Sequence, residues 1–323
     1  MANENTKKIR QILLQHKTIT KPELAKETGL TVAACGYLLN ALVEKDEVIA
    51  EDFRTSNGGR PAMSYRYNAK KVKFLCLYAI SESGAEILSY RIIDALGEIH
   101  GAGEFKEKRI HVRAISNRIL KLLQSNPEIR IVTIGIQGGV CNGVVEFSDF
   151  PELDGIDLSK ELSQKIGLPV YVENDMNTIA LGYSEKNHQE KDVAILFVPK
   201  GNPPAGGFLT DGKILHGSTN LAGELSCYPF AFDRSKQKEI FDSFKTAFPP
   251  IKQILLSSIV FLDPAVVVFT GGFAEELAKQ NLEVQIRNHL KRPYRPRLEF
   301  IPNPIEEYFS GLAKIAEDHF LNF

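Results

Sequence analysis

Three consecutive polar residues interrupt the apolar stretch LPVYVENDMNTIALG, residues 168–182. The β-branched and aromatic residues before them predict a short buried strand, and the apolar residues after them recur at helical spacing. A strand that runs directly into a helix brings its polar junction to the carboxyl edge of a sheet, where open α/β proteins bind small polar ligands. The side chains at this junction, Glu173, Asn174 and Asp175, are therefore candidate ligand-binding groups.

A structural role explains the same junction. Asn and Asp are both favoured N-cap residues, so either Asn174 or Asp175 would serve to start the helix without any ligand. The choice between a cap and a binding site depends on the rest of the chain.

The composition excludes several classes of protein. A chain of 323 residues is long enough for two or three domains. Its 39 Lys and Arg nearly balance its 40 Asp and Glu, so the overall charge indicates no particular partner. The first 70 residues hold 11 Lys and Arg against 8 Asp and Glu, a mildly basic segment that fits nucleic acid. We find no signal peptide and no bilayer-spanning apolar run, so we expect a soluble, cytoplasmic protein with no membrane contact. The scattered cysteines argue against disulfides and a structural zinc site; they are Cys35, Cys76, Cys141 and Cys227.

Residues 6–68 predict a small domain of three helices and a hairpin. The second helix has Pro22 in its first turn and Gly29 at its end, and the third begins at Thr31, a plausible N-cap. The following segment alternates apolar and polar residues on both sides of a Gly-rich tip, as a β-hairpin wing does. This order predicts a winged helix-turn-helix. The residues expected in its core are Ile9, Ile12, Leu13, Leu38, Leu42 and Val43.

The chemistry of this domain favours DNA as its partner. The first residues of the third helix are small enough to let the backbone approach base edges in the major groove. An Arg held by glycines and a proline at the wing tip suits a narrow, electronegative minor groove. The alternative is a winged helix that binds a second copy or a peptide. The residues expected to contact DNA are Thr31, Ala33, Ala34, Tyr37, Arg54 and Arg60.

From residue 71 onward the pattern indicates two α/β lobes. Three strands in a meander precede an amphipathic helix, residues 111–125, and a buried strand with a glycine-rich end, residues 131–140. The second lobe contains a hairpin with an Asp211-Gly212 turn, a helix over residues 251–263 and a strand AVVVFTGG. A meander followed by alternating helices and strands predicts a ribonuclease-H-like lobe.

Five motifs together resemble the ROK family of repressors and sugar kinases. The head ends in GGRP, which is typical of the transcription factors of that family. The other four follow in family order: GIQGGVCNGVV, GLPVYVENDMNTIALG, LHGSTNLAGELS and LDPAVVVFTGG. The resemblance covers nearly the whole chain and implies an α/β fold in which a winged helix-turn-helix precedes a two-lobed actin-like ATPase domain.

The resemblance implies ligand-binding roles for particular residues. In relatives, the residues that match Asn174 and Asp175 hydrogen-bond the hydroxyls of a sugar, and in the kinases that Asp is the general base. Glu224 matches another sugar contact, although a carboxylate at a helix N-terminus explains it too. Gly139 would permit close backbone approach. His216 and Lys200 are interpreted as surface residues.

The departures from the family pattern predict that catalysis has been lost. The family's Asp-x-Gly-Gly-Thr hairpin reads LYAISESGAEI here, and the second phosphate loop contains Pro203 and Pro204, which lack the N–H that an anion needs. Cys227 replaces a zinc-binding His, and no cysteine follows it in YPFAFDRSKQKEIFDSF, so we expect no metal and no cofactor.

These observations predict a transcriptional repressor without kinase activity that binds operator DNA and a sugar, sugar phosphate or sugar derivative. We expect a homodimer, and the choice between a dimer and a tetramer stays open. The expected domains are residues 1–70, residues 71–173 with 304–323, and residues 174–303, the last carrying the dimer interface. Two alternatives are a sugar kinase with a DNA-binding head and an effector-independent DNA-binding protein.

Overall fold

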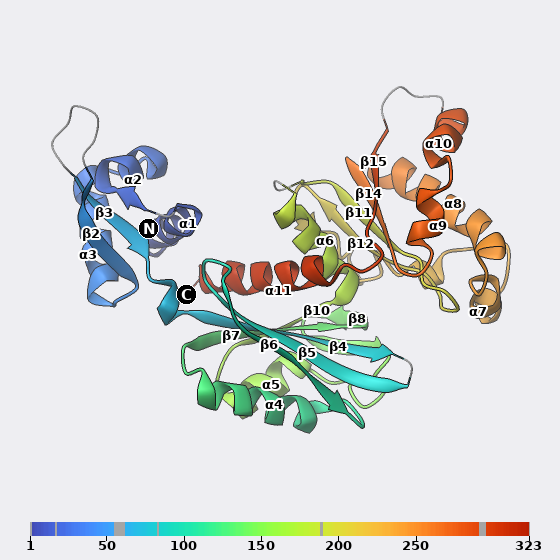
Figure 1. The fold of residues 1–323 in the computed structure, drawn as a ribbon, viewed down its shortest axis with the longest axis horizontal. Helices are drawn as coiled ribbons and strands as arrows, with labels where there is room; N and C mark the ends of the chain where they lie inside the picture. Colours follow the sequence, from blue (N-terminus) through green and yellow to red (C-terminus); the bar gives the residue numbers. More distant parts are fainter. Residues whose placement is uncertain are drawn as a thin grey trace.

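The computed structural model describes residues 2–16, 18–54, 62–82, 84–187, 190–290 and 295–322. A small head lies to one side of two sheet-containing lobes, and a long helix, α11, runs from the lobes toward the head (Figure 1). Within the described residues, no helix combines the length and the apolar character needed to cross a membrane.

The head is a winged helix-turn-helix, as predicted. Its elements are α1 (Ala2–Gln15), β1 (Ile19–Thr20), α2 (Lys21–Thr28), α3 (Val32–Glu44), β2 (Val48–Arg54) and β3 (Ala62–Tyr67). The strands form an antiparallel sheet in the order β1-β3-β2. Thr20 and Glu23 form a capping box at the start of α2, and Gly29 ends that helix with φ 74°. Thr31 caps α3 by accepting the N–H of Ala34 at 3.2 Å.

The buried face of α3 differs from the predicted one. Cys35, Leu39 and Leu42 are buried. Leu38 and Val43 are only partly buried. The buried residues follow the spacing i, i+4, i+7 of one helical face. The prediction was right for Leu42, but it missed Cys35 and Leu39, and Leu38 and Val43 pack only at the edge of the core, because the run is apolar on more than one side.

The smaller lobe has the predicted meander. Its elements are η1 (Ala69–Lys71), β4 (Lys73–Glu82), β5 (Ala85–Asp94), β6 (Ile99–Glu107), α4 (Val112–Ser125), β7 (Ile129–Ile136), β8 (Gly138–Cys141), β9 (Val144–Ser148), α5 (Leu158–Ile166) and β10 (Val170–Asn174). The main sheet has the order β10-β7-β4-β5-β6, in which β7 is parallel to β4 and β10. The strand expected over residues 131–140 is divided in two, because the chain turns at Gly138 with φ 148° and starts a separate β8-β9 hairpin.

The larger lobe contains a second five-stranded sheet of order β13-β12-β11-β14-β15. Its elements are α6 (Asp175–Lys186), β11 (Val193–Phe197), β12 (Ala205–Thr210), β13 (Lys213–Ile214), η2 (Leu225–Cys227), η3 (Arg234–Lys236), α7 (Gln237–Ile240), α8 (Phe244–Leu262), β14 (Val266–Thr270), α9 (Ala274–Ala278), α10 (Leu282–Leu290) and β15 (Arg297–Phe300). The predicted turn is confirmed, with φ 50° at Asp211 and 73° at Gly212. Helix α8 begins earlier than expected and contains Pro249 and Pro250, each of which leaves a carbonyl of the preceding turn without its helical donor.

Helix α11 (Ile305–Phe320) connects these parts. It packs on α6 and on strands β4 and β7 of the smaller lobe. At its end, the ring of Phe320 lies 6.3 Å from that of Tyr67 in the head and 5.9 Å from that of Phe74 in β4. Buried residues of the head, the smaller lobe, α6 and α11 therefore form one continuous core.

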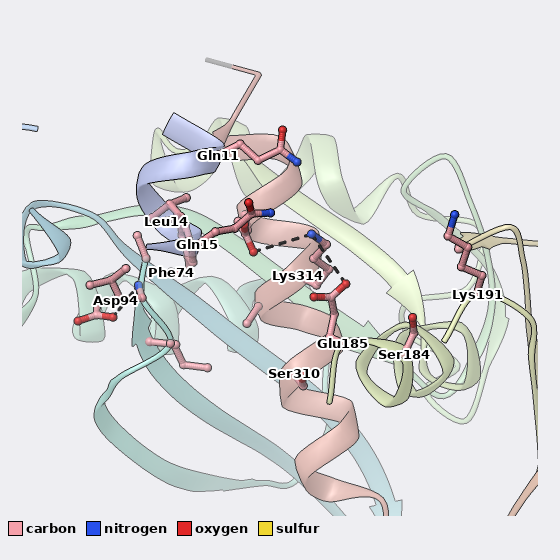
Figure 2. Close-up of a pocket in the computed structure, with 17 residues that line it drawn as sticks. Gln11, Leu14, Gln15, Phe74, Asp94, Ser184, Glu185, Lys191, Ser310 and Lys314 are labelled. Atoms are coloured by element: carbon pink, nitrogen blue, oxygen red, sulfur yellow. Dashed lines mark hydrogen bonds and ion pairs between the residues drawn. The ribbon is translucent and has the colours of Figure 1, made fainter. Parts of the chain in front are cut away.

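A cavity of about 500 Å³ separates the head from the lobes beside this contact (Figure 2). Gln11 and Gln15 of α1 form one side of it. Lys314 of α11 lies on another side, 3.8 Å from Glu185 and 3.9 Å from Glu317 (Figure 2). The packed contact between the head and the lobes therefore lies at Phe320, beside this open cavity.

Candidate functional site

A second cavity, of about 640 Å³, lies between the smaller and the larger lobe. Its volume falls in the range of small-molecule binding sites. The junction predicted to bind ligand opens onto it, because β10 belongs to one sheet and α6 packs on the other. The polar residues that line it are Tyr78, Ser81, Gln137, Ser148, Asp149, Asn174, Asp175, Asn202, Glu224, Ser226, Asn303 and Tyr308.

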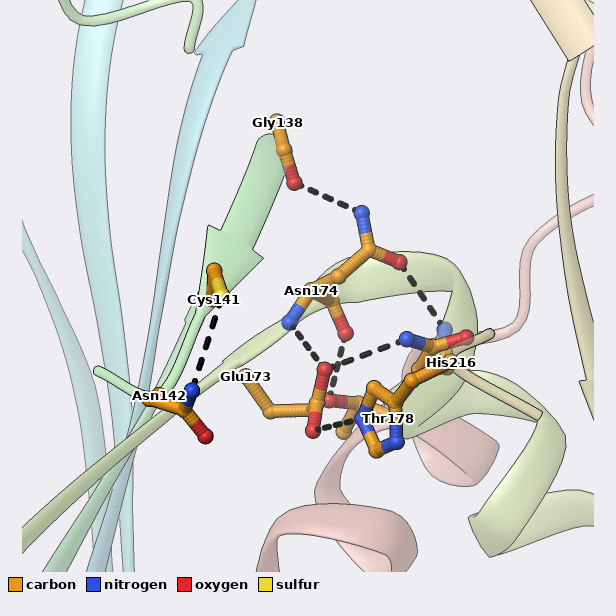
Figure 3. Close-up of polar contacts among 8 residues, drawn as sticks. Gly138, Cys141, Asn142, Glu173, Asn174, Thr178 and His216 are labelled. Carbon is orange, nitrogen blue, oxygen red and sulfur yellow. Dashed lines mark hydrogen bonds and ion pairs between the residues drawn. The ribbon is translucent and has the colours of Figure 1, made fainter. Parts of the chain in front are cut away.

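Asn174 serves both as a helix cap and as part of the cavity wall. Its Oδ1 accepts the N–H of Asn177 at 3.0 Å, and its Nδ2 donates to the carbonyl oxygen of Gly138 at 2.7 Å (Figure 3). A side-chain amide has two N–H groups and two acceptor sites. One of each remains for a ligand, so the capping role and the binding role are compatible.

Glu173 supports this junction from behind. Its Oε1 accepts the backbone N–H of Asn174 at 2.9 Å and the Nδ2 of Asn177 at 3.1 Å. His216 Nε2 lies 3.0 Å from Glu173 Oε2 (Figure 3), and this hydrogen bond raises the pKa of His216. His216 is thus half-buried and paired, which corrects its interpretation as a surface residue. Lys200 is exposed.

Asp175 is the first residue of α6 and lies where three acidic groups approach one another. Its Oδ1 accepts the N–H of Met176 at 3.0 Å. Burial raises the pKa of Asp175 to about 7, and the negative charges of Glu224 and Asp149 act in the same direction. At neutral pH this carboxyl group is therefore present in both protonation states and can either donate or accept a hydrogen bond.

Glu224 faces the same cavity from the larger lobe. Burial raises its pKa, and Arg234 opposes the shift. Glu224 precedes the short helix η2, but its side chain makes no capping hydrogen bond. The carboxylate is therefore available to the cavity. The adjacent Gly223 has φ 93°, and a Cβ there would overlap the carbonyl oxygen of Gly206, so the backbone requires glycine at this position.

Of the four predicted ligand residues, the structure brings three together and places the fourth elsewhere. Gly138 lines the cavity, but Gly139 does not. A Cβ on Gly139 would lie 2.5 Å from the Phe147 ring, so its small size serves packing of the hairpin. The expected role of Gly139 is corrected accordingly.

Sequence reasoning did not assign the other polar residues of this cavity, and Asp149 and Tyr308 are two of them. Asp149 follows β9 in the segment EFSDFPELD, residues 146–154, where three other acids surround it and no local signal singles it out. Tyr308 is in α11, in a helical pattern that predicts core packing and nothing more. Its hydroxyl is buried and has no hydrogen-bond partner among the described residues.

The backbone positions expected to have lost phosphate binding also lie at this cavity. Pro203 and Pro204 line it and have no N–H to donate. On the opposite lobe, the backbone N–H of Ser81 already donates to Gln137 Oε1 at 2.9 Å. These positions offer few free backbone donors to an anion.

In the head, the start of α3 is open to solvent. Thr31 and Ala33 are exposed, Ala34 is partly buried, and the side chain of Tyr37 is 77% exposed. Thr31, Ala33 and Tyr37 therefore face solvent at the start of α3, and Ala34 does so only in part; their contact with DNA stays a prediction. Arg54 ends β2, but its side chain, like all of Arg60, lies outside the described residues.

The fold and the cavity define a class of protein: a winged helix-turn-helix head joined to a two-lobed domain of the sugar-kinase type. Comparison with known proteins agrees. The ROK family profile matches residues 80–238, and a profile for winged helix-turn-helix DNA-binding domains matches residues 3–46. The chain therefore carries a ROK family domain behind an N-terminal winged helix-turn-helix domain.

Relatives of known structure or name show how far this likeness extends. A crystal structure of a ROK family transcriptional regulator, described as a homologue of the E. coli MLC protein, superposes with a TM-score of 0.73 at 16% identity, over 99% of this chain and 98% of that one. A ROK hexokinase from Thermus thermophilus gives 0.59 at 18% identity, over 77% and 99%. The xylose repressor of Caldicellulosiruptor bescii is 24% identical to this chain over 66% of its residues. The matched region covers 55% of the length of that repressor.

Proposed function

We propose that this protein is a cytoplasmic transcriptional repressor that binds operator DNA as a dimer and responds to a sugar-type effector. The effector would occupy the 640 Å³ cavity and contact Asn174, Asp175 and Glu224. These groups suit hydroxyls, since carboxylates accept hydrogen bonds and an amide both donates and accepts them. The observation that carries the proposal is that this cavity and the DNA-binding head meet the same helix, α11.

The contacts of α11 supply a physical route for linkage. Tyr308, in its first turns, lines the cavity, and Phe320, at its end, touches the head. The distance along the helix between them is about 18 Å at the usual rise per residue. Arg10 of α1 also lies over the Phe320 ring, at 5.7 Å, and pairs with Glu47 of the head. An effector that favours one position of α11 would thereby favour one position of the head.

DNA binding is tested with the full chain on duplexes selected from a random library. We expect a palindromic footprint with half-sites separated by whole helical turns, because a two-fold dimer presents two heads. Tyr37→Ala should weaken binding about 5- to 10-fold, or roughly 1–1.4 kcal/mol. Leu120→Ala, which also truncates an exposed apolar side chain but in α4, is the matched control. Equal effects of the two variants would contradict a DNA-contacting role for Tyr37.

A second candidate function is a sugar kinase with an added DNA-binding head. One observation favours it: the pKa of Asp175, about 7, is suited to a general base. Pro203, Pro204 and the occupied N–H of Ser81 argue against it, because phosphoryl transfer needs donors around the phosphates. A coupled assay with Mg-ATP over a panel of sugars should show no turnover. Turnover that is lost in Asp175→Asn would replace the proposal with this alternative.

The remaining alternative is a DNA-binding protein that needs no effector. A thermal-shift screen of neutral sugars, amino sugars and sugar phosphates distinguishes it, since a ligand at 100 times its Kd adds about 2.7 kcal/mol of stability. No shift with any of these compounds would remove the effector from the proposal.

We also propose the three-part division into residues 1–70, 71–173 with 304–323, and 174–303, with the dimer interface on the last part. Exposed apolar residues on that part support the interface. Val260 and Phe261, at the end of α8, are 61% and 81% exposed, and contiguous apolar surface of this kind often marks a contact with another protein. Pairing of such dimers into a tetramer is left open.

A further inference from the structure

The cavity between the lobes extends well beyond the polar junction at the start of α6. The strand register places Ala79 of β4, Ile136 of β7 and Asn174 of β10 at one level of the sheet in the smaller lobe. Neighbouring strands lie about 4.8 Å apart, so the end of β4 is two strands, or about 10 Å, from Asn174. Ile80, the next residue of β4, lines the cavity at this point. The cavity therefore continues from the polar junction to the end of β4.

The wall of the cavity beyond the junction includes apolar side chains from three elements. Ile80 comes from β4, Pro203 from the loop before β12, and Ile305 from the start of α11. The ring of Tyr78 in β4 stacks on that of Tyr308 in α11, with 4.7 Å between ring centres, and this contact brings the ends of the strand and the helix together. Ile80, Pro203 and Ile305 are only partly buried. They therefore keep apolar surface that a ligand can cover.

This part of the cavity offers little to an anion. No Lys, Arg or His is among the described residues of the cavity wall. Pro203 and Pro204 have no N–H, and the N–H of Ser81 already donates to Gln137 Oε1. Because phosphate and carboxylate groups are recognised by cationic side chains and N–H donors, the group that fits here is uncharged.

The size of the cavity also exceeds the need of a single sugar ring. Cavities of about 300–1,000 Å³ enclose drug-sized ligands, which are larger than one hexose, and this cavity has about 640 Å³. A sugar ring held by Asn174, Asp175 and Glu224 would occupy the polar part. The apolar part would then remain for a further group of the same molecule.

We propose that the effector is a sugar derivative with an uncharged apolar substituent, such as an aryl or acyl group, and that this substituent lies against Ile80, Pro203 and Ile305. This inference rests on the proposed function and assigns a chemical class to its effector. Covering the three side chains favours binding in proportion to the apolar area removed from water. Because Ile305 is the first residue of α11, the substituent is the part of the effector that would touch the helix reaching the head.

The test measures binding to the full chain by calorimetry at neutral pH. The probes are glucose, galactose, mannose and N-acetylglucosamine, each as the free sugar, as its two phenyl glycosides and as its 6-benzoyl ester. The 1-phosphates and 6-phosphates carry a charged group at the same positions. We expect at least one aryl derivative to bind about ten-fold or more tightly than its free sugar. No phosphate should show this gain.

Two variants test the location of the aryl group. Ile80→Ser and Pro203→Ser should each lower the ratio of aryl affinity to free-sugar affinity by about three-fold or more, because each removes apolar contact area. Ile166→Ser is the matched control, since Ile166 is also partly buried but lies in α5, outside this cavity. Thermal unfolding of each variant verifies that it folds. Pro203 lies in a loop, so its variant complements the change in a strand.

The outcomes separate this inference from the proposed function. Free sugars that bind as tightly as their aryl derivatives, or phosphates that bind more tightly than both, would overturn the inference and leave the proposed function intact. The same holds for an aryl preference that Ile80→Ser and Pro203→Ser leave unchanged, or that Ile166→Ser lowers equally. Binding of none of the probes would overturn both the inference and the sugar effector, while binding to selected DNA would survive.

Discussion

Gly182 of α6 and Gly311 of α11 meet where the two helices cross. A Cβ on Gly182 would lie 2.5 Å from the backbone nitrogen of Gly311 and would overlap the carbonyl oxygen of Glu307. A Cβ on Gly311 would overlap the carbonyl oxygen of Thr178. The helix that begins at the ligand junction and the helix that ends at the head are thus in backbone contact.

Gly311→Ala should destabilise the protein by about 1–3 kcal/mol, the usual cost of overpacking. The direction is informative because Gly to Ala in a helix normally stabilises by about 0.5–1 kcal/mol. Gly36→Ala in α3 is the matched control, since its Cβ would meet only the Lys21 side chain, at 3.5 Å. Denaturant unfolding of both variants provides the measurement, and a stabilised Gly311→Ala would show that the helices separate easily.

Phe320→Leu should loosen the head without unfolding the lobes. The substitution keeps an apolar side chain but removes the ring contacts with Tyr67, Phe74 and Arg10, which are worth about 0.5–1.5 kcal/mol beyond simple burial. Hydrogen exchange should become faster for the amides of α1 and remain unchanged for those of α6. Leu120→Ala serves as the control, and unchanged exchange in α1 would argue against Phe320 as the contact that positions the head.

Asp175→Asn should change how stability depends on pH. The pKa of Asp175 is about 7 in the folded protein, above the ordinary value of 3.8, so the folded state binds the proton more tightly than the unfolded state. The contribution of Asp175 to stability therefore falls as pH rises from about 4 to 7.

Asn resembles the protonated acid, so the variant should lose this part of the pH dependence. Relative to the wild type it should be more stable at pH 8 than at pH 4, by about 1–3 kcal/mol after allowing for solvent in the cavity. Asp149 and Glu224, whose pKa values are also raised, and Tyr308 face the same group and remain in both proteins. A difference that does not vary with pH would contradict the raised pKa of Asp175.

Phe261→Ser should weaken self-association. The side chain is 81% exposed in one chain, so burying it in a dimer would contribute about 1.5–3 kcal/mol, and its loss should raise the dimer dissociation constant at least ten-fold. Sedimentation equilibrium measures this constant directly. Leu120→Ala is again the control, and a dimer unaffected by Phe261→Ser would place the interface on another surface.

Much of the fold was predictable because its signals are local. The capping threonine Thr31, the helix-ending Gly29 and the Asp211-Gly212 turn act through their own or neighbouring backbone groups, and each was located correctly. Errors arose where an apolar run fits more than one helical face, as at Leu38 and Leu39, or where a strand breaks at one glycine, as at Gly138.

The candidate site was predictable in part for the same reason. Asn174 and Asp175 are adjacent, and their strand-to-helix junction is a local pattern, so the residues themselves identified both. The family resemblance then added Glu224. No local pattern relates Asp149 or Tyr308 to that junction, and His216 reaches Glu173 from a distant loop.

The sequence by itself determined the order of helices and strands, the winged head and the polar junction at the start of α6, because backbone propensity, capping and periodicity depend on near neighbours. Only the tertiary structure decided that Asp149, Asp175, Glu224 and Tyr308 share one cavity and that α6 and α11 cross in backbone contact. Those relationships arise from packing between segments far apart in the chain, where charge, burial and unpaired hydrogen bonds become defined only once the lobes have come together.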